Sequence, residues 1–285
     1  MHEADGTQGR SIRSDEASGV LNPDNLSRYA ARWLDPAPEV RGVVDQYWRV
    51  RWRLDKGEAI DQAVIDLPAI TLTVEAGDVP APLVVTGVQR EAWHRRITGS
   101  GDVFAIRLRP AGLGTLSSLS ADRLVDAVVP LTAAVDERLH SLMARIAREC
   151  TPEARARAAD ELIAARLQEQ QPPPAHVLAN EVLAELRSRA YRHTGAPLAE
   201  HFGVSERTIQ RVLAATLGIG PKQAARRIRL QEAAQAIVVH DDDELADIAV
   251  QLGYADQAHL TSDFRAATGT TPGAYRRTLR RLVSR

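Results

Sequence analysis

The first half of the chain alternates apolar and polar residues, which is the pattern of β-strands with one buried face. Between residues 43 and 110 the alternation recurs in three segments, which are Trp48, Val50, Trp52 and Leu54, then Ile70, Leu72 and Val74, then Phe104, Ile106 and Leu108. In the first segment Arg49, Arg51 and Arg53 occupy the opposite face. Prolines and glycines separate the segments, so the pattern predicts a small antiparallel sheet or barrel.

From Leu116 onward the apolar spacing becomes helical, three and four residues apart. The segment QEQQPPP, residues 168–174, cannot continue a helix through three prolines and predicts a stiff spacer. We therefore expect an α+β chain with four parts. These are a disordered lead-in (1–25), a β-rich domain with closing helices (26–167), a proline-rich linker (168–177) and an all-helical domain (178–285).

The helical domain contains an internal repeat. Leu198–Gly218 reads LAEHFGVSERTIQRVLAATLG and Leu245–Gly269 reads LADIAVQLGYADQAHLTSDFRAATG, each a short helix, a glycine turn and a longer helix. Ser205 and Asp256 are predicted to cap the longer helices. Both segments are predicted helix-turn-helix units. Between them, Pro221 to about His240 predicts one helix of about 30 Å, close to the ~34 Å between successive major-groove faces on one side of DNA.

The net charge of −1 conceals an asymmetry between the two halves of the chain. Residues 175–285 carry 15 basic and 12 acidic residues, and the remaining 174 residues carry 21 and 25. Lys222, Arg226, Arg227 and Arg229 cluster in sequence, and residues 276–285 hold five arginines without an acid. This distribution favours a nucleic-acid partner for the helical domain.

Several classes of protein are disfavoured by composition. The longest nearly uncharged apolar run, Ala127 to Val135, is too short to span a bilayer, and residues 1–20 lack the apolar core of a secretory signal. The single cysteine, Cys150, fits a reducing compartment and is interpreted as an inert thiol. We therefore expect a cytoplasmic protein with no membrane partner.

The helical domain resembles the DNA-binding domain of AraC/XylS-type transcription regulators. The resemblance covers about residues 178–285 and is carried by Gly218, Pro221, Arg229, Leu230, Ala233, Ile248, Ala249, Gly253, Tyr254, Phe264, Gly269, Pro272, Tyr275 and Arg276. More loosely, residues 86–112 resemble the cupin-like amino-terminal domain of such regulators, which implies that the β-rich domain (26–167) is cupin-like and serves sensing or dimerisation. The resemblance implies a sequence-specific transcription regulator that binds double-stranded DNA. It leaves open RNA polymerase, a small-molecule effector and a second copy of the chain as further partners.

The longer helix of each unit should place its solvent face in the major groove. The predicted DNA-binding residues are Ser205, Arg207, Thr208, Gln210, Arg211, Gln257, Ala258, His259, Ser262, Arg265, Arg276 and Arg277. By family position Arg207, Gln210 and Arg211 read bases. The second unit looks weaker, because alanines stand where phosphate-binding cations are common and Asp263 would repel the DNA backbone. The competing interpretations are a solvated helix face and a solubilising arginine tail.

In the first domain, Trp48, Trp52, Trp93, Phe104 and Arg107 are candidates to line an effector pocket, or they are ordinary core. Arg107 and Arg109 alternate outward and either grip an anion or face water. The strand region contains only His94, so neither a metal site, a cofactor nor a catalytic residue is expected. The alternative function is a small-molecule-binding or enzymatic first domain that the helical domain merely tethers.

Overall fold

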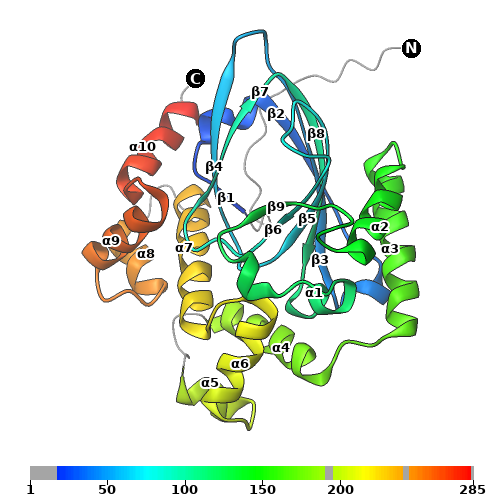
Figure 1. The fold of residues 1–285 in the computed structure, drawn as a ribbon. Helices are drawn as coiled ribbons and strands as arrows, with labels where there is room; N and C mark the ends of the chain where they lie inside the picture. Colours follow the sequence, from blue (N-terminus) through cyan, green and yellow to red (C-terminus); the bar gives the residue numbers. More distant parts are fainter. Residues whose placement is uncertain (1–17, 190–194, 240–243, 284–285) are drawn as a thin grey trace.

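The computed structural model describes residues 18–189, 195–239 and 244–283, and it confirms the expected α+β class (Figure 1). The described residues form a six-stranded sheet in the order β2-β3-β8-β5-β6-β9 and a three-stranded sheet in the order β1-β4-β7, with all neighbours antiparallel. The strands are β1 (Ser18–Val20), β2 (Tyr29–Leu34), β3 (Val44–Arg53), β4 (Ala59–Asp66), β5 (Thr71–Gly77), β6 (Leu83–Thr86), β7 (Trp93–Thr98), β8 (Ser100–Leu108) and β9 (Val128–Pro130).

The pairing of β3 with β8 gives the six-stranded sheet two different faces. Trp48 lies opposite Ala105 and Trp52 lies opposite Gly101, on the same face as Arg107. A Cβ atom at Gly101 would lie 2.1 Å from the Trp52 ring, so only glycine fits there. The other face carries Tyr47 and Phe104, whose rings stack with centroids 5.7 Å apart in the main core. Near Tyr47 and Arg107 both faces are covered, whereas the sequence pattern predicted one buried face. At the other end of β3, Arg51 and Arg53 are exposed, as that pattern predicted.

Helices cover the Tyr47 face of the large sheet (Figure 1). They are α1 (Pro110–Leu116), α2 (Glu137–Ala147) and α3 (Pro152–Glu169). Three short 3-10 helices precede the strands β2, β3 and β9, and these are η1 (Pro23–Arg28), η2 (Pro38–Val40) and η3 (Ala121–Leu124). The Tyr47 hydroxyl donates to Asp160 Oδ1 of α3 at 2.8 Å, and the Ala37 amide donates to the same oxygen at 3.1 Å. This carboxylate therefore fixes α3 to the sheet.

The remaining helices form the expected repeat. They are α4 (Pro174–Arg189), α5 (Ala196–His201), α6 (Glu206–Leu217), α7 (Pro221–Val239), α8 (Leu245–Gln251), α9 (Gln257–Thr268) and α10 (Pro272–Val283). The two units are α5–α6 and α8–α9, with α7 between them as one continuous helix. Its predicted inward residues, Ile228, Ala233 and Ile237, are fully buried, as the apolar spacing required. No described helix is long and apolar enough to cross a bilayer.

The helical part is packed directly on the β-rich part. Ala63 and Ile65 of β4 share one apolar cluster with Ala234 and Ile237 of α7. Backbone groups also pair across this contact, because the Ala92 amide donates to the Ala267 carbonyl at 2.8 Å. A second core runs from the large sheet through α1 into α4 and α6. The described parts of the two regions therefore bury apolar surface against each other along most of α7.

Two expected boundaries differ from the structure. Residues 18–25 are not a disordered lead-in, because β1 pairs with β4 and Val20 and Leu21 are buried; residues 1–17 lie outside the described residues. The linker is shorter than 168–177, since α3 continues to Glu169 and α4 begins at Pro174. Proline fits there because the first turn of a helix needs no backbone donor. The acidic run after His240 also lies outside the described residues.

Candidate nucleic-acid interface

The helices α6 and α9 are built alike. Each has 12 residues and ends at a glycine in the left-handed conformation, Gly218 with φ 73° and Gly269 with φ 74°. Ser205 Oγ accepts from the Thr208 amide at 3.1 Å, and Asp256 Oδ1 accepts from the His259 amide at 2.7 Å. Both predicted caps are thereby confirmed. Position 2 of α6 is Arg207 and position 2 of α9 is Ala258, so the two helices can be compared residue by residue.

Each of these helices follows a glycine turn that ends the shorter helix of its unit. Gly203 has φ 62° between α5 and α6, and Gly253 has φ 71° between α8 and α9. A residue with a Cβ atom is disfavoured in this conformation, so glycine lets the chain reverse within a few residues. The same local chemistry thus sets the entry of both longer helices.

The outer face of α6 is open to solvent. Its buried face holds Ile209, Val212, Leu213 and Leu217, and the residues left exposed are Glu206, Arg207, Gln210, Arg211, Ala214 and Ala215. The structure therefore brings Arg207, Gln210 and Arg211 together on one surface. Ser205 is exposed but its hydroxyl lies 3.0 Å from that of Thr208, which is half-buried, so these two residues shape the helix start.

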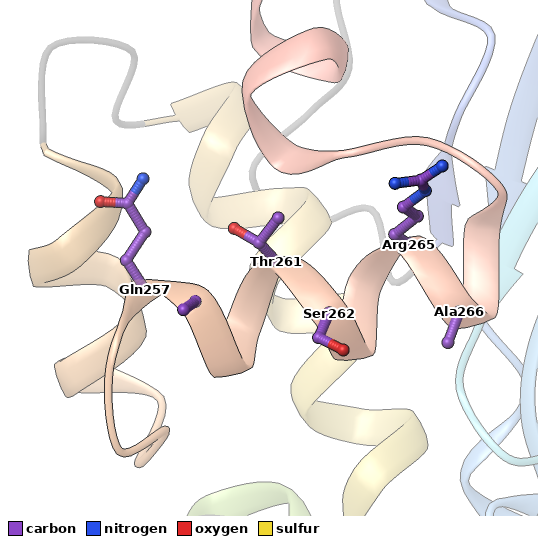
Figure 2. Close-up of a pocket in the computed structure, with 6 residues that line it drawn as sticks. Gln257, Thr261, Ser262, Arg265 and Ala266 are labelled. Atoms are coloured by element: carbon purple, nitrogen blue, oxygen red, sulfur yellow. The ribbon is translucent and has the colours of Figure 1, made fainter.

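The outer face of α9 is also exposed, and it borders an open hollow of about 860 Å³ (Figure 2). The hollow is lined by Gln257, Ala258, Thr261, Ser262, Arg265 and Ala266. His259 is exposed as well, but its ring packs edge-on against Tyr254 with centroids 5.2 Å apart, away from this stripe. Thr261 and Ala266 are not among the DNA-binding residues predicted from the sequence, although their spacing from Ala258 and Ser262 is helical.

Asp263 does not act as the exposed repulsive charge that the sequence suggested. Its Oδ1 accepts from Arg226 Nε at 2.6 Å and its Oδ2 accepts from the Tyr254 hydroxyl at 3.1 Å. Burial raises the pKa of Tyr254, so the phenol stays a donor. The guanidinium of Arg229 lies 5.0 Å over the Tyr254 ring. Because a paired carboxylate projects little negative potential, Asp263 does not repel the DNA backbone as the sequence suggested.

The cations of α7 serve mostly inside the molecule. Lys222 is exposed, but Arg226 is paired with Asp263 and Arg227 is only 4% exposed. Arg227 donates from Nε to the Asp66 carbonyl at 2.8 Å and from Nη1 to the Glu91 carbonyl at 2.6 Å. Burial lowers the pKa of Arg227 to about 10. Clustering in sequence therefore overstated the positive surface of this helix.

The arginines after α9 divide between two roles. Arg277 is exposed on α10, whereas Arg276 is half-buried beside Tyr275. The Tyr275 hydroxyl donates to the Val20 carbonyl at 2.7 Å, which holds α10 against the strand β1. Arg280 and Arg281 are exposed one turn later. The solvent-facing cations of this helix that could meet a phosphate are thus Arg277, Arg280 and Arg281.

The five candidate effector-binding residues do not share one surface. Phe104 lies in the main core, on the face of β8 opposite to Arg107. Of the two predicted roles of Arg107, binding an anion or facing water, the second is wrong, because the residue is only 2% exposed. Arg107 pairs with Asp66 at 3.0 Å and with Asp45 at 3.5 Å, and its guanidinium lies 5.1 Å over the Trp48 ring. The Trp52 Nε1 donates to the Thr98 carbonyl at 3.1 Å. Trp93 lies on β7 of the small sheet, opposite Val64.

One further polar group on this side of the large sheet was missed. Arg95 of β7 lies 5.7 Å over the Trp52 ring and pairs with Glu75 of β5 at 2.9 Å. Arg95 Nη2 and Arg107 Nε are buried without a hydrogen-bond partner. The alternation of Trp93, Arg95 and Ile97 could have revealed the inward arginine. Among the described residues, no three His, Cys, Asp or Glu side chains gather as a metal site.

Two family models match the chain. Residues 198–278 match a family described as a helix-turn-helix domain, and residues 32–130 match a domain of unknown function (DUF6597). The first match spans both units and the helix α7, and it agrees with the resemblance carried by the sequence signature. The second lies within the β-rich part and carries no assigned role.

Curated relatives are similar over about a third of this chain or less. The transcriptional activator RhaS of Escherichia fergusonii is 34% identical over 79 residues, covering 28% of this chain and 28% of that protein. A putative AraC-like transcription regulator of Streptomyces lividans is 33% identical over 101 residues, or 35% and 33% of the two chains. The chain thus spans about a third or less of these relatives. A solved structure of ToxT from Vibrio cholerae aligns with TM-score 0.44 and 10% identity, over 88% of this chain and 99% of that chain.

Proposed function

We propose that the whole protein is a sequence-specific, DNA-binding regulator of transcription, in which residues 198–278, which match a helix-turn-helix family, read the DNA. One observation carries the proposal. Two helices of the same length and the same capping, α6 and α9, both leave their outer faces open to solvent on one chain. We propose that it acts in the cytoplasm and has no catalytic activity of its own.

The helix α7 supports binding to two neighbouring grooves. Its 19 residues correspond to about 28 Å at 1.5 Å per residue. Successive major-groove faces on one side of B-DNA are ~34 Å apart, so a rod of this length suits two adjacent contacts. The apolar contacts of α7 with β4 and the ion pair from Arg226 to Asp263 stiffen this spacing.

Within α6, the exposed long side chains define the proposed contacts. Arginine pairs bidentately with guanine and glutamine with adenine, each pair contributing about 1–3 kcal/mol of discrimination. We propose that Arg207, Gln210 and Arg211 read bases in this way. Arg277 on α10 is proposed to bind phosphate, where it adds affinity without sequence preference.

The test separates base reading from phosphate binding. Sequences selected from a random DNA pool by the full chain define the operator, and nuclease protection measures its extent. Arg211→Ala should lower the preference for operator over random DNA by about tenfold or more, as loss of one bidentate pair implies. Arg277→Ala should weaken binding to both DNAs equally and flatten the salt dependence. Equal effects of both variants on both DNAs, or no protected segment, would contradict the proposal.

We further propose that the β-rich domain senses a small molecule between its two sheets. Trp48, Trp52 and Arg107 share one face of the large sheet, and Arg95 reaches Glu75 there from the small sheet. The buried free nitrogens of Arg95 and Arg107 favour a ligand with acceptor oxygens. Asp66 connects this face to α7, because Arg107 donates to the Asp66 carboxylate and Arg227 of α7 donates to the Asp66 carbonyl. A ligand bound here would thus lie one residue away from the helix between the two helix-turn-helix units.

A panel of small carboxylic acids tests this sensing role by thermal shift. A ligand of this site should raise the Tm of the full chain but not that of Trp48→Leu, and it should change operator affinity. Ligands that act equally on both proteins bind elsewhere. RNA polymerase and a second copy of the chain are the further partners that such regulation implies, and sedimentation with and without operator DNA tests the second.

A further inference from the structure

The second reading helix carries short side chains where the first carries long ones. Helix positions 2, 5 and 6 are Arg207, Gln210 and Arg211 in α6, whereas in α9 they are Ala258, Thr261 and Ser262. In both helices the capping residue directly precedes position 1 and a glycine directly follows position 12, so equal position numbers mark equivalent places in the two helices. The two units therefore present different chemistry to the same kind of groove.

Short side chains leave an open surface along α9. The hollow of about 860 Å³ follows this stripe, and Figure 2 shows its lining residues along successive turns of the helix. Of the six lining residues, Ala258, Thr261 and Ala266 carry methyl groups, Ser262 carries a small hydroxyl, and Gln257 and Arg265 carry the long side chains. Such side chains cannot form a bidentate bond with guanine or adenine, but methyl groups make apolar contacts with the C5-methyl of thymine.

The other polar residues of α9 either pair with residues of this chain or lie near the two ends of the helix. Asp263 is held by Arg226 and Tyr254, and His259 packs against the Tyr254 ring. Gln257 lies in the first turn and Arg265 in the last turn, four residues before and after Thr261, so the long side chains stand near the two ends of the helix. The centre of the α9 surface is consequently uncharged, while its ends can bind a base edge or a phosphate.

Resting on the proposed function, we propose that α9 recognises its half of the operator mainly through thymine methyl groups, whereas α6 recognises its half through guanine and adenine hydrogen bonds. The half-site under α9 is then rich in A·T pairs whose thymines face Ala258, Thr261 and Ala266. Because Ala258 has no side-chain donor or acceptor, discrimination at its position depends on the methyl group alone.

Deoxyuridine substitution tests the proposal with the unaltered protein. Uracil pairs with adenine as thymine does but lacks the C5-methyl group, so only the proposed contact is removed. In the operator selected by the full chain, each contacted thymine of the α9 half changed to deoxyuridine should raise Kd about fourfold, the effect of exposing one methyl-sized group. The same change in the α6 half should raise Kd less than twofold.

A matched pair of substitutions tests the residue assignment. Ala258→Arg places in α9 the residue that α6 carries at the same position, and should introduce a G·C preference into the α9 half-site while removing its dependence on thymine methyls. Arg207→Ala makes the converse change in α6 and should remove a guanine preference there. Both positions are exposed, and circular dichroism verifies that the helices are retained.

The outcomes separate this inference from the proposed function. Selection of a discrete operator with a methyl-dependent α9 half supports both. A discrete operator whose two halves respond equally to deoxyuridine, or an Ala258→Arg chain with unchanged selection, overturns the inference and leaves the proposed function in place. Failure to select any operator overturns both.

Discussion

Arg227 offers a sharp test of how the helical domain is held. It lies on α7, is 4% exposed, and donates to two backbone carbonyls of the β-rich domain, those of Asp66 and Glu91. We expect Arg227→Met, which keeps an unbranched, flexible side chain but removes the guanidinium donors, to weaken the attachment of α7.

The expected loss of unfolding free energy follows from contributions of opposite sign. Two hydrogen bonds from a charged donor contribute about 3–6 kcal/mol together, and their loss leaves both carbonyls without this donor. The lowered pKa of Arg227, about 10, shows that burial also penalises its charge, by about 1.4 kcal/mol per pH unit, and methionine removes that penalty. The net loss of unfolding free energy should therefore be about 1–3 kcal/mol.

Urea denaturation measures this loss, and limited proteolysis locates it. Cleavage in the connection at residues 170–173, between α3 and α4, should accelerate as α7 detaches from β4. Lys222→Met is the matched control, because it removes a cation from the exposed first turn of the same helix. The control should stay within about 0.5 kcal/mol of the wild type. An Arg227→Met chain with unfolding free energy and cleavage rate like those of the control would refute the reasoning.

Three further predictions concern stability. Burial raises the pKa of Glu232 to about 7. The folded chain therefore binds more protons than the unfolded chain between about pH 4.5 and 7, and it loses stability as pH rises through that window. Glu232→Gln should raise the unfolding free energy by about 1–2 kcal/mol at pH 8, after discounting for solvent screening, and by much less at pH 4. A pH-independent difference in urea titrations would contradict this. Asp256→Ala should cost about 1 kcal/mol through loss of the α9 cap, with faster amide exchange at His259, whereas Asp256→Asn should retain most of it. Phe264→Ala should cost about 3–5 kcal/mol, because this fully buried ring packs 6.0 Å from that of Tyr275; a loss below 1 kcal/mol would show that the core collapses around the gap.

Local patterns predicted the helical repeat closely, because each unit is specified by neighbours in sequence. Ser205 and Asp256 cap helices that begin at the next residue, and Gly218 and Gly269 end them. The apolar spacing of α7 likewise identified its buried face. Such features depend on helical period and on bonds within one turn, which a single sequence displays directly.

Roles that depend on distant partners were not predictable in the same way. The alternation of Arg107 with apolar residues left open whether it binds an anion or faces water, and in the structure it is buried and paired with Asp45 and Asp66. Arg227 belongs to a basic cluster in sequence, but it donates hydrogen bonds to backbone carbonyls 161 and 136 residues away. Asp263 looked repulsive until Arg226, 37 residues earlier, was found beside it.

The sequence by itself determined the two helix-turn-helix units, their spacing along one helix, and the side chains that their outer faces present. Only the tertiary structure decided which charges remain available to a partner, because burial and pairing depend on surfaces that meet after folding. It also decided that the β-rich part is packed directly against the reader. The contacts between β4 and α7 bring together residues about 170 positions apart, and no local period encodes such a contact.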